Sequence, residues 1–115
     1  MTDEMIARSL KALGDPTRRE IVEFLTKSCC GSAAVLEDGG IEGPTASEVC
    51  CHITGQDKIN STISHHLHEL ADANLIQIQR RGKAMVCTVC RDNLSSLGEY
   101  FATLAATQPE EGCCC

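Results

Sequence analysis

The spacing of apolar residues changes from helical to alternating and back again in the second half of this chain. Residues 59–73 place apolar side chains every three to four positions, which is typical of an amphipathic helix. Residues 76–79 alternate Ile with Gln, which predicts a half-buried strand, and residues 84–89 return as a second strand. Residues 93–106 resume the helical spacing. This order predicts a mainly α fold with one small β-hairpin.

The first half of the chain reads as helices separated by clear breaks. In residues 4–13, the apolar face of the predicted helix carries Ile6, Leu10 and Leu13, and Gly14 ends it. A second helix follows this glycine directly. We expect the second helix to run to about Lys27 and to bury Ile21, Val22 and Leu25.

Local capping signals mark where the next helices begin. Asp15 followed by Pro16 is typical of an N-cap and a first helical position. Residues 28–44 are rich in Gly and predict a long loop, which in a compact domain usually has a function. Thr45 and Glu48 have the spacing of a capping box and predict a short third helix.

The charge of the chain is unevenly distributed. The formal net charge is −6, but residues 56–91 carry five Lys and Arg against three Asp and Glu. Residues 1–55 and 92–115 each have a net charge of −4. A polyanion would therefore approach the middle segment, because local charge decides where it can bind.

A short helix, a tight turn and a helix with a polar outer face form a helix-turn-helix pattern, whose second helix fits the major groove of DNA. The residues expected to contact DNA from this helix are Asn60, Ser61, Thr62, Ser64 and His65. Arg80, Arg81 and Lys83, at the expected hairpin turn, suit phosphate or minor-groove contacts. The alternative interpretation is an ordinary polar surface helix and a charged turn.

Three segments resemble the ArsR/SmtB family of metal-responsive repressors: LKALGDPTRREIVEFL, STISHHLHELADANLI and RRGKAMVCTV. The resemblance covers roughly residues 4–105 and implies a winged helix-turn-helix homodimer that binds palindromic operator DNA and leaves it when an inducer binds. It assigns the five polar residues above to the recognition helix, and residues 80–83 to the wing. It also implies a dimer interface on the first and last helices, in agreement with the apolar stripe of residues 94–104.

Nine cysteines are many for 115 residues. Seven of them form adjacent groups: Cys29 with Cys30, Cys50 with Cys51, and Cys113, Cys114 and Cys115. The odd number, the adjacent pairs and an acidic N-terminus unlike a signal peptide all disfavour a secreted disulfide framework. No apolar run approaches the length of a membrane span. We therefore expect a cytoplasmic protein whose thiols carry out metal or redox chemistry.

The resemblance implies sensor cysteines on the short third helix, where this chain has Cys50 and Cys51. Adjacent helical residues point about 100° apart, so a third ligand must come from elsewhere. We expect it from Cys29, Cys30 or both. Three thiolates would suit As(III) or Sb(III) as the inducer, whereas four would suit cadmium, lead or zinc.

Other interpretations of the thiols stay open at this point. Cys113, Cys114 and Cys115 could bind a soft ion from a flexible Cys-rich tail, residues 108–115, that follows a winged-helix domain of residues 1–107. The paired cysteines could instead be small buried hydrophobes. A repressor that senses oxidants or persulfides through its thiols would share the same DNA-binding half. We expect no enzymatic activity, because the sequence has no phosphate-binding loop and no catalytic Ser/His/Asp set.

Overall fold

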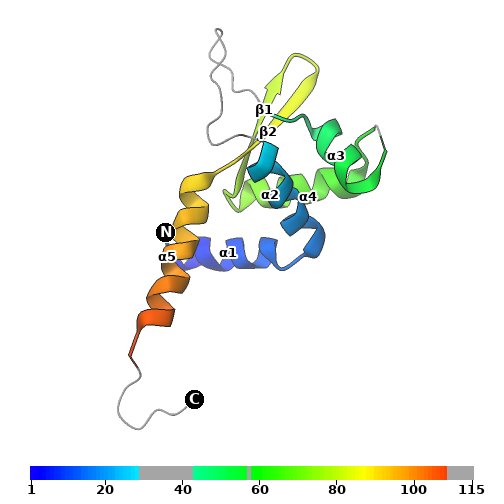
Figure 1. Cartoon of the computed structure of the whole chain (residues 1–115). Coiled ribbons are helices and arrows are strands. Elements are labelled where there is room, and N and C mark those ends of the chain that lie inside the picture. The colour runs from blue at the N-terminus through cyan, green and yellow to red at the C-terminus, as the bar shows by residue number, and fades with distance from the viewer. Residues whose placement is uncertain (29–42, 57, 109–115) are drawn as a thin grey trace.

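The computed structural model describes residues 1–28, 43–56 and 58–108. Its elements, in chain order, are α1 (Asp3–Leu13), α2 (Pro16–Ser28), α3 (Ala46–Thr54), α4 (Ser61–Asp72), β1 (Ile76–Arg81), β2 (Ala84–Val89) and α5 (Arg91–Ala106). Helices α1 to α4 form the body, the hairpin projects from one end, and α5 leads away in the other direction past α1 (Figure 1). The predicted mainly α fold with one hairpin is confirmed.

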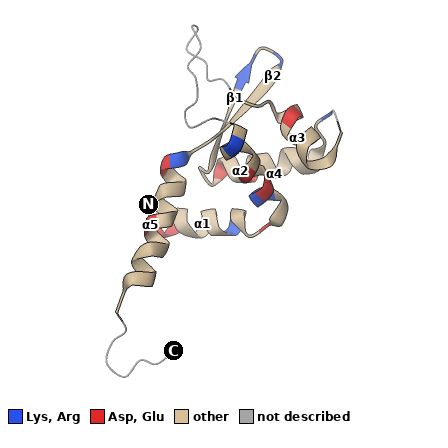
Figure 2. Cartoon of the chain, viewed as in Figure 1, with Lys and Arg blue, Asp and Glu red and all other residues tan. Residues whose placement is uncertain are grey.

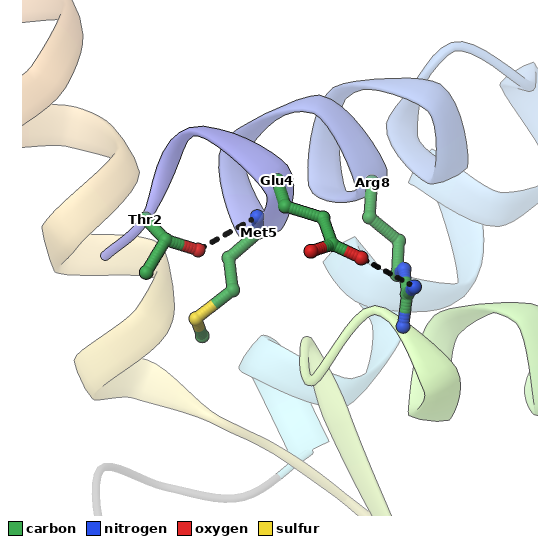
Figure 3. A network of polar contacts seen from close by, with 4 residues as sticks. All are labelled: Thr2, Glu4, Met5 and Arg8. Carbon is green, nitrogen blue, oxygen red and sulfur yellow. Dashed lines mark hydrogen bonds and ion pairs between the residues drawn. The ribbon is translucent and has the colours of Figure 1, made fainter.

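A side-chain cap and an ion pair stabilise the N-terminal end of α1 (Figure 3). The Thr2 hydroxyl accepts a hydrogen bond from the backbone N–H of Met5 at 3.2 Å. One turn further, the Arg8 guanidinium lies 3.3 Å from the Glu4 carboxylate, in an exposed pair. A pair of this kind contributes only about 0.3–0.5 kcal/mol, so α1 depends mainly on its packing.

Asp15 caps α2 as its position in the sequence predicts. One carboxylate oxygen accepts the backbone N–H groups of Thr17 at 2.8 Å and Arg18 at 3.1 Å. The hydrogen bond from the Arg18 backbone lowers the pKa of the Asp15 carboxyl below its usual value. The side chain of Arg18 donates to the carbonyl of Ala12 at 2.8 Å, so the sharp corner between α1 and α2 is held from both sides.

The core lies between α2, α3, α4 and the base of the hairpin. The apolar stripe of α4 is buried as expected, with Ile63, Leu67 and Leu70 each at most 2% exposed. The other fully buried large side chains include Ile21, Leu25, Val49, Cys50, Leu75 and Cys87. Aliphatic side chains and cysteine fill this core.

The face of α1 that packs against the body carries small side chains at its centre. Ile6 and Leu13 contact the core, but Leu10 is 38% exposed, and the buried positions are Ser9 and Ala12. These small side chains allow α1 to lie close to the end of α4, where the Ser9 hydroxyl donates to the carbonyl of Ala73 at 3.5 Å. Leu10, which the helical spacing places on the apolar face, is thus left uncovered in the single chain.

The hairpin β1–β2, called the wing below, is tighter than expected. Its antiparallel register pairs Arg80 with Met85 and Arg81 with Ala84, so both arginines lie in β1 rather than in the turn. The turn is Gly82 and Lys83, and Gly82 has a φ of 60°. A positive φ at the first central position is the geometry that two-residue hairpins favour.

The residues just before α3 pair with β2 on the edge of the wing. Thr45 forms a bridge with Val86, and the carbonyl of Pro44 accepts the N–H of Cys87 at 2.8 Å. A Cβ atom on Gly43 would lie 3.0 Å from the carbonyl oxygen of Cys87. Only glycine fits here without displacement of the strand, so the chain is held against β2 immediately before α3 begins.

Helix α5 begins at Arg91, two residues before the expected start, and packs against the core with its first turns. Leu97 is buried and Leu94 packs against the core, whereas Phe101 and Leu104 are exposed. An apolar stripe on the outer half of α5 is therefore uncovered in the single chain. No helix in the described residues has the length and apolar character needed to cross a bilayer.

Candidate nucleic-acid interface and thiol groups

Caps hold both ends of α3 and the start of α4. Thr45 and Glu48 form the predicted capping box, in which the N–H of Glu48 donates to the Thr45 hydroxyl at 3.1 Å. Helix α3 ends at Gly55, which adopts a left-handed conformation with φ of 79°. Asn60 caps α4, because its side-chain oxygen accepts the N–H of Ile63 at 2.8 Å. This is the geometry of a helix-turn-helix.

The outer face of α4 is polar at its N-terminal end. Ser61, Thr62 and His65 are exposed and Ser64 is half-buried, while Ile63 faces the core. The first turn contains no acidic residue. The free N–H groups and the partial positive charge of a helix N-terminus favour anions, so this end can receive a phosphate or a base edge.

Asn60 differs from the other predicted contacts, because it lies before α4 rather than on it. It is half-buried, and its carboxamide oxygen is used by the cap. Further along α4, the His65 imidazole lies 3.9 Å from the Glu69 carboxylate, and His68 Nδ1 lies 3.0 Å from the carbonyl oxygen of Ser64. His65 is exposed and lies one turn from the N-terminus of α4.

The wing carries the basic residues that the sequence analysis selected. Arg80 and Lys83 are exposed, and Arg81 is half-buried. The Arg80 Nε donates to the carbonyl of Gly82 at 3.3 Å, which holds the guanidinium beside the turn. Figure 2 shows this positive charge at the far end of the hairpin, whereas α5 has no Lys or Arg after its first residue. The positive charge and the polar end of α4 are thus separate from the uncovered apolar stripe.

The two adjacent cysteines of α3 have opposite surroundings. Cys50 is 0% exposed and Cys51 is exposed. The Cys50 thiol donates to the carbonyl of Lys58 at 3.3 Å, and its sulfur lies 3.5 Å from the Thr54 hydroxyl and 3.9 Å from the Asn60 amide nitrogen. The helical divergence expected for adjacent residues is confirmed. In this conformation, one thiol faces the helix-turn-helix and the other faces solvent.

The remaining predicted thiol ligands lie outside the described residues. These are Cys29, Cys30, Cys113, Cys114 and Cys115. Within the described ranges, no three His, Cys, Asp or Glu side chains gather closely enough to hold a metal ion. The predicted thiolate site therefore stays a prediction.

A ring contact that the sequence analysis missed joins α2 to α3. The Phe24 and His52 rings are stacked, with centroids 4.2 Å apart and planes inclined by 22°. Phe24 lies one turn before the end of α2, where the Ser28 hydroxyl donates to its carbonyl at 2.8 Å. His52 directly follows Cys51. The last turn of α2 and the thiol pair of α3 are therefore neighbours, although only the separate helices could be inferred from the sequence.

The other two described cysteines have different positions. Cys87 lies opposite Ile78 in the hairpin and is fully buried, and this burial raises the pKa of its thiol to about 11. A thiol of this kind is uncharged at neutral pH and packs as a small apolar group. Cys90 is half-buried at the N-cap of α5, and its N–H donates to the carbonyl of Leu75 at 2.8 Å. The burial of Cys87 indicates that its side chain packs within the hairpin as part of the core.

Comparisons with solved structures agree on the fold. An ArsR family transcriptional regulator is 22% identical over 91% of this chain and 91% of its own, with a TM-score of 0.67. A possible transcriptional regulator for arsenical resistance is 22% identical over 86% of this chain and 85% of its own, with a TM-score of 0.61. A homodimeric winged helix-turn-helix DNA-binding domain from Mycobacterium bovis, described as a possible ArsR-family regulator, is 16% identical. It aligns over 100% of this chain and 96% of its own, with a TM-score of 0.60.

No protein-family model matches the sequence, and no curated protein is similar to it. At these levels of identity, the structural matches establish the fold. The chain folds as a winged helix-turn-helix of the kind found in ArsR-family regulators.

Proposed function

We propose that this chain, a winged helix-turn-helix with the architecture of ArsR-family regulators, is a transcriptional repressor of that family. It binds operator DNA as a homodimer, and a soft metal or metalloid ion bound to cysteine thiolates releases it. The role is one of binding rather than catalysis, and it suits the cytoplasm, where thiols stay reduced.

The observation that carries the DNA-binding proposal is the outer face of α4. Its first turns present short polar side chains without an acidic residue, at the positive end of the helix. The wing adds Arg80 and Lys83 as exposed cations. In a winged helix, α4 would enter the major groove while the wing contacts the adjacent backbone or minor groove. The net charge of −6 does not oppose this, because the acidic excess lies in other segments.

Selection of duplexes from a random DNA pool, followed by binding measurements at several salt concentrations, tests this proposal. Replacement of Ser61 and His65 by alanine should weaken binding to the selected sequence at least tenfold, because each base contact contributes about 1–3 kcal/mol. The matched control is Ser95→Ala, an exposed serine on α5. No enrichment of any duplex, or equal losses in variant and control, would refute the assignment.

The uncovered apolar stripe of α5 supports the homodimer. Phe101 and Leu104 are exposed and lie three residues apart on one face, and Leu10 of α1 is exposed as well. A second copy of the chain would cover these side chains. The Mycobacterium bovis domain of the same fold is described as homodimeric.

We propose that Cys50 and Cys51 form the inducer site together with Cys29, Cys30 or both. The Phe24–His52 stack supports this set, because it brings the end of α2 beside the thiol pair of α3. Three thiolates would select As(III) or Sb(III), and a fourth would favour cadmium, lead or zinc. One of the solved structures with this fold is described as a possible regulator for arsenical resistance.

Titration of the protein–DNA complex with arsenite, antimonite, cadmium and zinc under reducing conditions tests the inducer proposal. Cys51→Ser should keep operator binding and lose release by the ion, since Cys51 is exposed and its replacement leaves the core intact. If no soft ion releases the wild-type protein, the ion-sensing proposal is wrong. Release by an oxidant or persulfide without metal, with the thiol modification seen by mass spectrometry, would support the thiol redox alternative instead.

The Cys-rich segment at the C-terminus offers a second source of thiolates. Replacement of Cys113, Cys114 and Cys115 by serine separates the two possibilities. Release by the ion should be unchanged in this variant, because the proposed trigger is Cys50 and Cys51 of α3 with Cys29, Cys30 or both. Loss of the response would assign the ion to the C-terminal segment.

A further inference from the structure

The Cys50 sulfur is the atom at which α3, the turn and α4 meet. Its S–H donates to the carbonyl of Lys58 in the turn at 3.3 Å. The sulfur also accepts from the amide nitrogen of Asn60 at 3.9 Å, a long contact suited to a weak acceptor. The Thr54 hydroxyl, one turn further along α3, lies 3.5 Å from the sulfur. Cys50 is 0% exposed, so water cannot replace the contacts of its sulfur unless the turn opens.

Asn60 uses both ends of its carboxamide. The oxygen accepts the N–H of Ile63 and caps α4, while the amide nitrogen points to Cys50. The contact with sulfur fixes which end of the carboxamide faces the helix, because the acceptor requires the nitrogen on its side. The position of the first turn of α4 therefore depends on a side chain of α3.

We propose that Cys50 is a positioning residue for the DNA-reading helix and acts through Asn60. By holding the Asn60 carboxamide and the Lys58 carbonyl, its sulfur sets the start of α4, the part expected to contact base edges. This inference rests on the proposed function, in that α4 is taken as the helix that reads DNA.

The inference gives the two adjacent thiols different tasks. A soft ion that takes the Cys50 sulfur withdraws it from Asn60 and Lys58, so ion binding reaches the cap of α4 through one atom. Cys51, the neighbouring residue of α3, is exposed and serves to capture the ion. Cys50 would then belong both to the ion site and to the contacts that hold the DNA-reading end of α4. No additional coupling pathway is needed between the two sites.

The test uses the full-length protein without any added ion. Hydrogen exchange of the Ile63 amide, followed by NMR, reports the cap directly and requires no DNA. Cys50→Ala should speed this exchange and weaken binding to the selected duplex, each by roughly fivefold, the usual size of a lost cap. Cys50→Ser should retain most of both properties, because a hydroxyl can still donate to Lys58 and accept from Asn60.

Asn60→Ser provides a second background, because serine caps a helix but has no amide for the sulfur. In this background, Cys50→Ala should change Ile63 exchange much less than it does in the wild type, because only the Lys58 contact is left to lose. The matched control is Cys87→Ala, which removes another fully buried thiol, away from the turn, and should leave the exchange of Ile63 at the wild-type rate relative to global unfolding.

Unchanged Ile63 exchange in Cys50→Ala would overturn the inference, as would additive effects of the Cys50 and Asn60 changes. If Cys50→Ala does not fold, Cys50→Ser decides: loss of the Ile63 protection in that folded variant contradicts the inference, and retention supports it. Failure of the wild-type protein to bind any duplex would refute the proposed function but leave the Ile63 measurement valid. The two claims can therefore fail separately.

Discussion

Replacement of both Phe101 and Leu104 by serine should dissociate the proposed dimer. Phe101 is 50% exposed and Leu104 is 54% exposed in the single chain. Complete burial of such side chains contributes about 2 kcal/mol each, so covering the exposed half contributes about 1 kcal/mol per residue. Two residues on each of two protomers give about 4 kcal/mol, which weakens the dimer Kd by roughly 10³-fold.

Sedimentation equilibrium over a range of protein concentrations measures this change. Met85→Ser is the matched control, because Met85 is 37% exposed on the wing, away from α5. The control should associate as the wild type does. Circular dichroism at a concentration where the double variant is monomeric should show the same helix content, because neither side chain belongs to the buried core.

An unchanged dimer Kd in the double variant would show that α5 is not the interface. A wild-type protein that stays monomeric at all concentrations tested would refute the assignment in the same way. The Met85→Ser control tests a further explanation, in which the loss of any exposed apolar side chain reduces self-association. In that case Met85→Ser would weaken the dimer as well.

Three smaller predictions follow from single features. Replacement of Arg80 and Lys83 by alanine should weaken binding to every duplex and lower the slope of log K against log salt by roughly 2, measured by fluorescence anisotropy; an unchanged slope would mean that the wing does not contact phosphates. Because burial raises the Cys87 pKa from 9.0 to about 11, its stabilisation is complete below pH 9 and is lost as the pH rises toward 11, by about 2–3 kcal/mol. Urea denaturation should show this loss in the wild type but not in Cys87→Val. The Asp15 pKa is lowered, so its contribution is present above about pH 3.8 and is lost as the pH falls below that value; thermal melts of Asp15→Asn should lack this acid dependence.

Local interactions made much of the fold readable from the sequence. The Asp15 cap and the Thr45–Glu48 capping box involve residues two or three positions apart, so their spacing alone predicted them. The stripe of Ile63 and Leu67 faces the core because one helix periodicity fixes it. The helix-turn-helix and the wing followed from the order of such elements.

Features that depend on how elements meet were missed or misplaced. The buried positions of α1 are the small Ser9 and Ala12, which periodicity alone does not predict because the packing of the neighbouring helix selects them. The carbonyl of Pro44 accepts the N–H of Cys87, which is more than forty positions away, and no local sequence pattern predicts this hydrogen bond. The sequence suggested no reason for these contacts, because they arise only when the elements pack.

The candidate site was predicted as a set of residues but not as an arrangement. Ser61, Thr62 and His65 lie on the exposed face as expected. Asn60, taken as a residue of the helix, caps it instead, and its link to Cys50 depends on the path of the turn between two helices. The thiol partners expected from Cys29 and Cys30 lie outside the described residues.

In the proposed dimer, the turn after α4 would determine the distance between the two DNA-reading helices. Asn74, with φ of 61°, follows α4, and the turn is held by Ser9 of α1 through the Ala73 carbonyl and by Asn93 of α5 through the Asn74 carbonyl. In a dimer built on α5, each α4 then keeps a constant distance from the twofold axis, so the spacing of the two half-sites, about 34 Å or a multiple, is a property of the protein. Insertion of roughly five base pairs, half a helical turn, would move one half-site to the far side of the duplex, beyond what this rigid corner can follow.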